Sequence, residues 1–204
     1  MRIAKCLGWR GAFVVFLSLL SGCGSLLPTQ PYTARADWPL APAPPEQQMP
    51  VPGGKVVVVR DLAAGPGLDQ RGVATIGPSG AIGYDYYNQW AVDPADAATG
   101  ALTEWLSASG KFGAVIGPGS RLDPDLIVEG ELTEFVADST VRQSRAIITL
   151  TVLNADHTLL GQRRLLGIAP LADTAPADVI RSERAAMTDA LRQSVSFVAA
   201  AAGR

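Results

Sequence analysis

The sequence predicts an α+β domain, with a two-layer arrangement in which two main helices pack on a mixed, largely antiparallel sheet. Three observations lead to this fold class. Residues 56–59 form a β-branched run, VVVV, which is typical of a buried central strand. Two later segments, beginning near residues 126 and 146, alternate apolar and polar side chains, as half-buried strands do. Two others, residues 94–109 and 176–202, repeat apolar residues at helical spacing, so helices are expected to cover one face of the sheet.

The stretch that follows the first strand has the composition of a loop. Residues 62–81 read LAAGPGLDQRGVATIGPSGA and contain two Gly-Pro steps and five glycines. Such steps mark turns. We therefore expect this stretch to be mostly turn and loop.

The next stretch, IGYDYYNQW at residues 82–90, holds three of the four tyrosines and one of the four tryptophans. Aromatic side chains serve equally well as core, as interface anchors and as stacking surfaces. Strand alternation would place Tyr84 and Tyr86 on one side and Tyr87 on the other. We expect Trp90 and one tyrosine set to pack against the first helix. The candidate partner surface is drawn from Tyr84, Tyr86, Tyr87 and Trp90.

A helix is predicted over residues 94–109. Pro94 suits a first helical turn, Gly110 suits a stop, and apolar side chains such as Leu102 and Leu106 share one face. Residues 112–116, FGAVI, are expected to form a strand. A helix between two apolar strands is the outline of a β-α-β unit, so the strands at Val56 and Val115 are expected to run parallel.

The remaining elements have clear periodicity. Alternation at residues 126–133 and 146–152 predicts two half-buried strands, and turn residues at 154–157 precede a returning strand at 158–168. A long amphipathic helix is predicted over residues 176–202. Its apolar stripe consists of Ile180, Met187, Leu191, Val195 and Val198.

The chain begins like an exported protein. Arg2, Lys5 and Arg10 precede the apolar run GAFVVFLSLL, a signal-peptide layout. A run of about ten apolar residues is too short to span the hydrocarbon core as a stable helix. The run ends in LSGC at residues 20–23, which resembles the lipobox of bacterial lipoproteins. This resemblance implies that Cys23 carries thioether-linked lipid and acyl (palmitate-type) chains. An ordinary secretory signal is the alternative.

Three regions are therefore expected. Residues 1–22 are a lipoprotein signal peptide, residues 23–54 are the lipidated cysteine with a Pro-rich tether, and residues 55–204 are the folded domain. Residues 24–54 contain eight prolines, which favours an extended, semi-rigid chain. Cys6 would leave with the signal, so no disulfide within one chain is available. In Gram-negative lipoproteins a residue such as Gly24 permits sorting to the outer membrane; inner-membrane anchoring is the alternative.

Composition excludes several classes of function. The chain has 17 basic and 19 acidic residues, without the basic stripe that nucleic-acid binding requires. The pair Arg163-Arg164 is interpreted as a solvated face. His157 is the only histidine and lies in a predicted hairpin turn, where it is interpreted as a solvated turn residue. We therefore expect neither a zinc site of the usual type nor a Ser-His triad. We predict no enzyme, no metal and no cofactor beyond the lipid on Cys23, although catalysis by carboxylates alone, such as Glu129 with Glu131, stays open.

Four stretches of the domain resemble a known family. They are VVVRDLAAGPGLDQRG, IGYDYYNQWAVDP, LTEWLSASGKFGAVIGPGS and DLIVEGELTEF. Together with the lipobox they are similar to the ABC-type transport auxiliary lipoproteins, over roughly residues 56–171. The resemblance implies a mixed sheet with helices on it. It also implies a periplasm-facing outer-membrane lipoprotein that works with an MCE-domain protein and an ABC transporter or permease in lipid transport.

Two functions of different class remain open. In the first, the protein is a non-catalytic docking subunit whose partner surface carries exposed aromatic residues without a deep pocket. In the second, the domain itself binds a lipid or another hydrophobic molecule in an apolar cavity. A third interpretation is a factor for cell-envelope assembly or membrane integrity. Homo-oligomer formation is compatible with each of these.

Overall fold

The computed structural model describes residues 32–203. The chain divides into two compact units, Met1–Ala34 and Arg35–Arg204, and the fold below is that of the second unit. The predicted signal peptide, Cys23 and the start of the tether lie outside the described residues. None of the helices within residues 32–203 is both long enough and apolar enough to cross a membrane.

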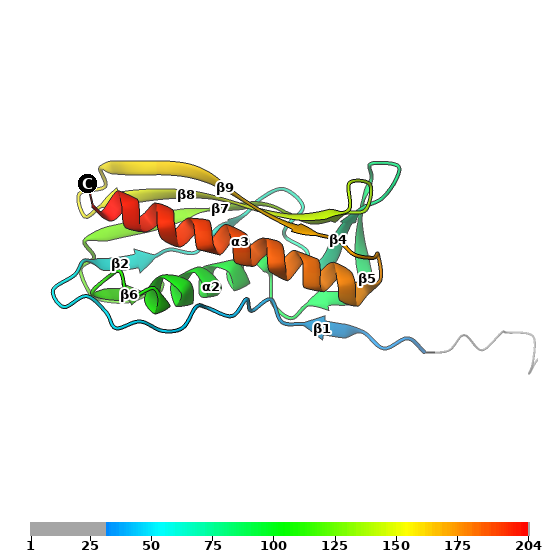
Figure 1. Ribbon diagram of the computed structural model, residues 1–204, viewed down its shortest axis with the longest axis horizontal. Helices are drawn as coiled ribbons and strands as arrows, with labels where there is room; N and C mark the ends of the chain where they lie inside the picture. The colour runs from blue at the N-terminus through cyan, green and yellow to red at the C-terminus, as the bar shows by residue number, and fades with distance from the viewer. Residues whose placement is uncertain (1–31, 204) are drawn as a thin grey trace, which may run out of the picture. The chain divides into compact units, whose positions relative to one another are not determined.

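A nine-stranded mixed sheet is built around one long strand, β7. One edge of β7 pairs antiparallel with β8 along its length, and β8 pairs antiparallel with β9. The other edge of β7 pairs parallel with β2, β3 and β4 in succession. Strand β6 lies outside β2, and β5 and then β1 lie outside β4 (Figure 1). The strands are β1 (Ala36–Trp38), β2 (Val56–Val59), β3 (Ala63–Ala64), β4 (Gly72–Ile76), β5 (Ile82–Trp90), β6 (Ala114–Ile116), β7 (Leu126–Asp138), β8 (Gln143–Asn154) and β9 (Leu159–Pro170).

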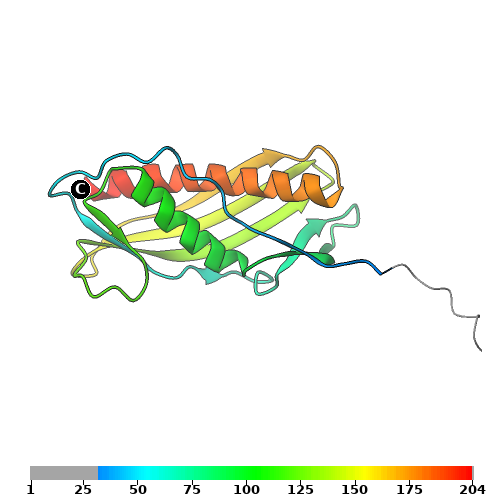
Figure 2. The ribbon, with the colours of Figure 1, turned by 90° about the horizontal axis from the view of Figure 1, so that it is seen from below.

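Two helices, α2 (Pro94–Ala108) and α3 (Pro176–Ala202), cover one face of this sheet (Figure 2). Their apolar faces and the inward side chains of β7 and β8 belong to one core. The five residues of the predicted stripe on α3 are all buried, because they are spaced by three, four or seven positions and so share one side of the helix. The predicted fold class, a two-layer α+β arrangement with a mixed sheet and two main helices, is confirmed.

The predicted β-α-β unit is also present. Val57 of β2 lies beside Val115 of β6, and the two strands run parallel. On its other edge β2 pairs parallel with the beginning of β7. Strand β2 is therefore a central strand, as its β-branched run predicts, and Val57 and Val59 are fully buried.

Residues 62–81 are mostly turn and loop, as predicted, but they also contain β3 and β4. Residues 72–76 form β4, which makes a hairpin with β5. Val73 is 2% exposed, so burial outweighs the weak strand propensity of the surrounding glycines. The second Gly-Pro step belongs to the hairpin turn, where Gly80 has φ +77° and the Gly77 amide donates to the Ala81 carbonyl at 3.1 Å. Gly-Pro steps here mark the ends of a strand and not its absence.

The structure also differs from the predicted boundary at Lys55. The compact unit begins at Arg35, and the Pro-rich segment lies along the helices. Trp105 Nε1 donates to the Pro42 carbonyl at 3.1 Å, and Arg184 Nε donates to the Pro39 carbonyl at 2.9 Å. Proline lacks an amide donor but keeps its carbonyl acceptor. Side chains of the helices can therefore donate hydrogen bonds to the Pro-rich segment, although its prolines cannot donate the backbone hydrogen bonds that a sheet requires.

Candidate functional site

The aromatic strand β5 is interrupted by a wide bulge. Ala74 of β4 pairs with Tyr84, but Gly72 pairs with Gln89, so residues 85–88 have no partner on β4. The Asp85 carboxylate holds this bulge. It accepts hydrogen bonds from the Tyr87 amide at 2.8 Å, the Asn88 amide at 3.0 Å and Asn88 Nδ2 at 2.8 Å. Strand alternation therefore fails between Asp85 and Asn88.

The bulge separates the four aromatic residues into three environments. Trp90 is 1% exposed and its ring centroid lies 5.4 Å from that of Phe135. Tyr84 is half-buried and its hydroxyl donates to the Gly67 carbonyl at 2.9 Å. Tyr86 and Tyr87 are 64% and 45% exposed, and their rings meet edge to face at 5.2 Å. We call Tyr86 and Tyr87 the aromatic pair.

Two sequence predictions for this stretch are corrected. Tyr86 and Tyr87 do not point to opposite sides of a regular strand, because the bulge brings their rings together. Trp90 cannot belong to a partner surface, because it lies in the core shared with the buried face of α2. Of the candidate surface, the aromatic pair is exposed and Tyr84 is half-buried.

Arg35 completes the aromatic pair. Its guanidinium carbon lies 4.1 Å from the Tyr86 ring centroid, and its Nε donates to the Tyr86 carbonyl at 3.1 Å. This cation–π contact limits the motion of an exposed ring. Sequence reasoning missed Arg35 because it placed this residue in the tether. The pairing of β1 with residues 88–90 of β5 brings it to the site.

A second feature is a hollow of about 320 Å³ where β4 diverges from β7. We call it the sheet hollow. Tyr84 of β5 and Arg145 of β8 both line it. Most of its other lining is apolar or backbone, from Pro66, Gly67, Leu68, Ala74, Ile76, Ile82, Thr133, Phe135 and Val136.

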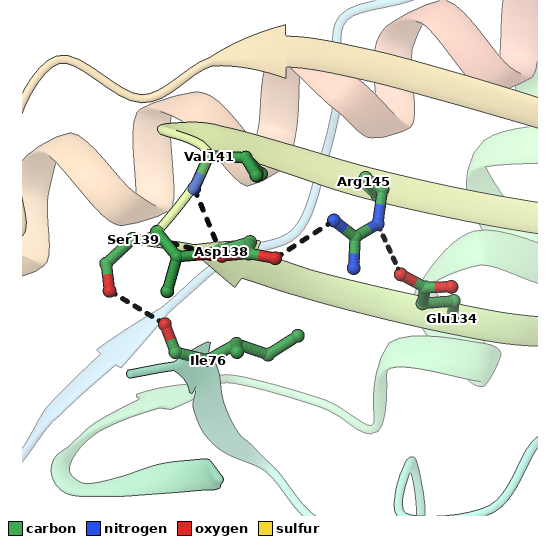
Figure 3. Close-up of polar contacts among 7 residues, drawn as sticks. Ile76, Glu134, Asp138, Ser139, Val141 and Arg145 are labelled. Atoms are coloured by element: carbon green, nitrogen blue, oxygen red, sulfur yellow. Dashed lines mark hydrogen bonds and ion pairs between the residues drawn. The ribbon is translucent and has the colours of Figure 1, made fainter. Parts of the chain in front are cut away.

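Arg145 and Glu134, which both line the sheet hollow, form an ion pair, and Arg145 forms a second one with Asp138 (Figure 3). Arg145 Nε contacts Glu134 at 2.6 Å and its Nη1 contacts Asp138 at 3.3 Å. Asp138 also accepts from the Thr140 hydroxyl at 2.6 Å. The Thr140 hydroxyl, aided by the Thr140 amide and Arg145, lowers the pKa of Asp138 to about 2. These charges are paired with one another, so the cluster fixes the β7–β8 turn.

The remaining candidate chemistry is not assembled in the part of the chain that the structure describes. His157 sits in the β8–β9 turn with φ +62°, and its amide donates to the Asn154 carbonyl at 3.0 Å. Within residues 32–203 there is no group of three or more side chains suited to hold a metal ion. Glu129 is paired with Arg60 at 2.8 Å.

Glu183 on α3 was missed by sequence reasoning. It is fully buried, and neither of its carboxyl oxygens makes a hydrogen bond of good geometry within the described residues. Burial raises its pKa well above the usual range, and the nearby backbone of Ala137 opposes this shift only in part. The signal was present: Glu183 lies three residues after Ile180 and four before Met187, on the apolar stripe.

The fold and these features define the class of protein. It is a two-layer α+β domain with an exposed aromatic pair and a small sheet hollow. A family model described as "ABC-type transport auxiliary lipoprotein component" matches residues 38–195. The chain belongs to this family, and the resemblance seen in the sequence is confirmed.

Solved structures agree on the fold. Protein XCC0632 from Xanthomonas campestris is 16% identical, with a TM-score of 0.67, over 81% of this chain and 96% of that one. A second, described as an uncharacterized protein, is 14% identical with a TM-score of 0.60, over 76% and 95% of the two chains. None of the curated proteins compared with this chain matches it.

Proposed function

We propose that this chain is a non-catalytic accessory subunit of an MCE-type intermembrane lipid transport system. In this proposal Cys23 is lipidated, the protein is held at the outer membrane facing the periplasm, and its partners are an MCE-domain protein and an ABC transporter or permease. The observation that carries the proposal is the family match over residues 38–195. The basic start, the apolar run and LSGC at residues 20–23 support the lipid anchor.

The aromatic pair is the surface we assign to the protein partner. Tyrosine and arginine are enriched among the residues that dominate binding energy at interfaces. Two exposed tyrosine rings that already contact each other, with Arg35 above one of them, lose little side-chain freedom when a partner covers them. The bulge held by Asp85 fixes their backbone as well.

The anchor brings this surface close to the membrane. The compact unit starts at Arg35, so eleven residues, 24–34, separate it from Cys23. A fully extended chain of that length spans at most roughly 40 Å. The domain is thus expected to stay near the membrane and to bind its partner there. Its maximum distance from the anchor is shorter than the tether of residues 24–54 would allow.

Absence of catalysis is supported by how the described polar groups are used. The carboxylates at the sheet hollow are committed to Arg145, and Glu129 is committed to Arg60. In the docking function these groups have a structural role only: their ion pairs stabilise the fold.

Co-purification tests the proposal. The full chain, solubilised in mild detergent, should carry an MCE-domain protein with it, and a Tyr86→Ala/Tyr87→Ala variant should lose that partner. A matched control, Leu122→Ala/Leu159→Ala, removes two side chains that are 59% and 60% exposed elsewhere and should retain it. If the tyrosine variant retained the partner, the aromatic pair would not be part of the interface.

A second candidate function rests on the sheet hollow. Its volume of about 320 Å³ is at the small end of the range of ligand pockets, enough for part of one acyl chain. In this alternative the domain itself binds the hydrophobic molecule. Lipid extraction and mass spectrometry of the same preparation separate the two: partner without lipid supports docking, and lipid without partner supports binding by the domain.

A further inference from the structure

The side chain of Asn88 connects the bulge of β5 to a neighbouring strand. Its Nδ2 donates to Asp85 Oδ2 at 2.8 Å, and the same carboxylate accepts the Tyr87 amide at 2.8 Å. Its Oδ1 accepts a hydrogen bond from Trp38 Nε1 at 3.1 Å. Trp38 belongs to β1, which is the edge strand outside β5 (Figure 1). A chain of three hydrogen bonds therefore runs from β1 to the backbone of the aromatic pair.

The chemistry of the two partners explains why an asparagine stands at position 88. A carboxylate only accepts hydrogen bonds, and an indole N–H only donates them. The carboxamide of Asn88 supplies a donor to Asp85 and an acceptor to Trp38, so its orientation is fixed from both sides. Aspartate at this position would lack the donor and would place a second negative charge beside Asp85. An apolar side chain would lack both groups.

Strand β1 also brings Arg35 to the other member of the aromatic pair. Arg35 directly precedes β1, and its guanidinium carbon lies 4.1 Å from the Tyr86 ring centroid. Its Nε donates to the Tyr86 carbonyl at 3.1 Å. The two tyrosines are therefore both held from β1, one through Arg35 at its start and the other through Trp38 at its end.

Strand β1 is short and lies at the edge of the sheet. It consists of Ala36–Trp38, and it pairs parallel with residues 88–90 of β5. Asp37 forms an ion pair with Arg71 at 2.7 Å, but the two side chains are 59% and 41% exposed, and an exposed ion pair contributes little to stability. A three-residue edge strand of this kind opens more readily than the strands of the core.

We propose that Asn88 is a positioning residue of the docking surface, which couples the placement of β1 on β5 to the backbone of the aromatic pair. This inference rests on the docking function proposed above. Its consequence is that the aromatic pair is set for a partner only while β1 lies on β5. Because Arg35 begins the compact unit, tension on the proposed anchor at Cys23 acts on β1 first and loosens both rings when β1 lifts.

Hydrogen–deuterium exchange tests the coupling on the full chain in mild detergent, with mass spectrometry of a peptide that covers residues 85–88. Trp38→Phe keeps an aromatic ring and removes the indole N–H. We expect it to speed exchange of residues 85–88 about twofold to tenfold, as the loss of one hydrogen bond allows. The matched control, Trp105→Phe, removes the indole N–H that donates to the Pro42 carbonyl and should leave this exchange unchanged.

Asn88→Ala breaks the chain of hydrogen bonds at its centre and gives a second, independent test. It should speed exchange both in residues 85–88 and in β1, and acceleration in only one of them would overturn the coupling. Because both residues act through one chain of hydrogen bonds, Trp38→Phe/Asn88→Ala should exchange no faster than Asn88→Ala alone. Effects that multiply in the double variant, or wild-type exchange of residues 85–88 in Trp38→Phe, would also overturn it.

Co-purification separates this inference from the docking function itself. The MCE-domain partner should be retained by the wild type and by Trp105→Phe, and should be reduced in Trp38→Phe and Asn88→Ala. If the wild type carries no partner, the docking function fails, and the exchange experiment alone decides the coupling. If a variant with accelerated exchange in residues 85–88 retains the partner in full, Asn88 does not position the docking surface.

Discussion

Replacing Glu183 with glutamine should remove a pH dependence from the stability of the fold. Glu183 is fully buried beneath α3 and its carboxyl oxygens lack hydrogen bonds of good geometry in the described structure. Burial of a carboxylate without a partner is costly, so the folded protein holds this group in its neutral form. The pKa of Glu183 is accordingly raised well above its ordinary value of 4.5.

The sign of the effect follows from the protons that each state binds. Below the ordinary value of 4.5, Glu183 is protonated in both the folded and the unfolded chain, and its contribution to stability is fully present. Above that value the unfolded chain releases the proton while the folded chain keeps it. The free energy of unfolding then falls by about 1.4 kcal/mol for each pH unit, until the pH passes the folded-state pKa.

Urea unfolding monitored by tryptophan fluorescence measures this slope. Between about pH 5 and about pH 6 the wild type should lose about 1.4 kcal/mol relative to Glu183→Gln, which has no proton to release. Glu104→Gln, at an exposed position of α2, is the matched control and should keep the wild-type slope. Equal slopes in the wild type and Glu183→Gln would refute the reasoning, because the group would then be charged in the fold or in contact with water.

Three further perturbations have definite expected results. Trp90→Ala should cost about 3–5 kcal/mol in denaturant unfolding, because it empties the site against Phe135; a loss below about 1 kcal/mol would contradict the buried contact. Gly167→Ala should prevent α3 from packing on β9, since an added Cβ would lie 2.0 Å from the Ala186 carbonyl oxygen. At Gly100 an added Cβ would meet nothing within 4 Å, so Gly100→Ala should raise the free energy of unfolding by about 0.5–1 kcal/mol. Thermal melting compares the two variants. In the wild type, Asp138 stabilises the fold above its ordinary pKa of 3.8, and this stability is lost as the pH falls toward about 2; Asp138→Asn should lack it. Acid titration followed by circular dichroism measures the difference, and identical unfolding of the two proteins would contradict the prediction.

Much of the fold could be predicted because periodicity records burial directly. The stripe of α3, the face of α2 and the alternation in β7 and β8 each bury the residues that the pattern indicates. Strand β4 was missed because it is short and lies among glycines and Gly-Pro steps. Its pairing with β5 and with the end of β7 makes it a strand. Pairing of that kind depends on distant parts of the chain.

The candidate site was harder to predict than the fold. The cluster of tyrosines was visible in the sequence, but which rings reach solvent depends on a bulge that one carboxylate, Asp85, stabilises. Arg35 joins Tyr86 across 51 positions of sequence, a separation that no local pattern reports. The docking of the Pro-rich segment was hidden for the same reason, since Trp105 and Arg184 supply its hydrogen bonds from distant helices.

Photo-crosslinking in cells tests the docking function most directly. A photoreactive amino acid is placed at position 87, in the exposed aromatic pair, and for comparison at position 156, in the β8–β9 turn. If the aromatic pair is the docking surface, position 87 crosslinks to an MCE-domain protein or another transport component, and position 156 does not. Crosslinks from position 87 to lipid alone, or to no protein while position 156 captures the transport component, would contradict it.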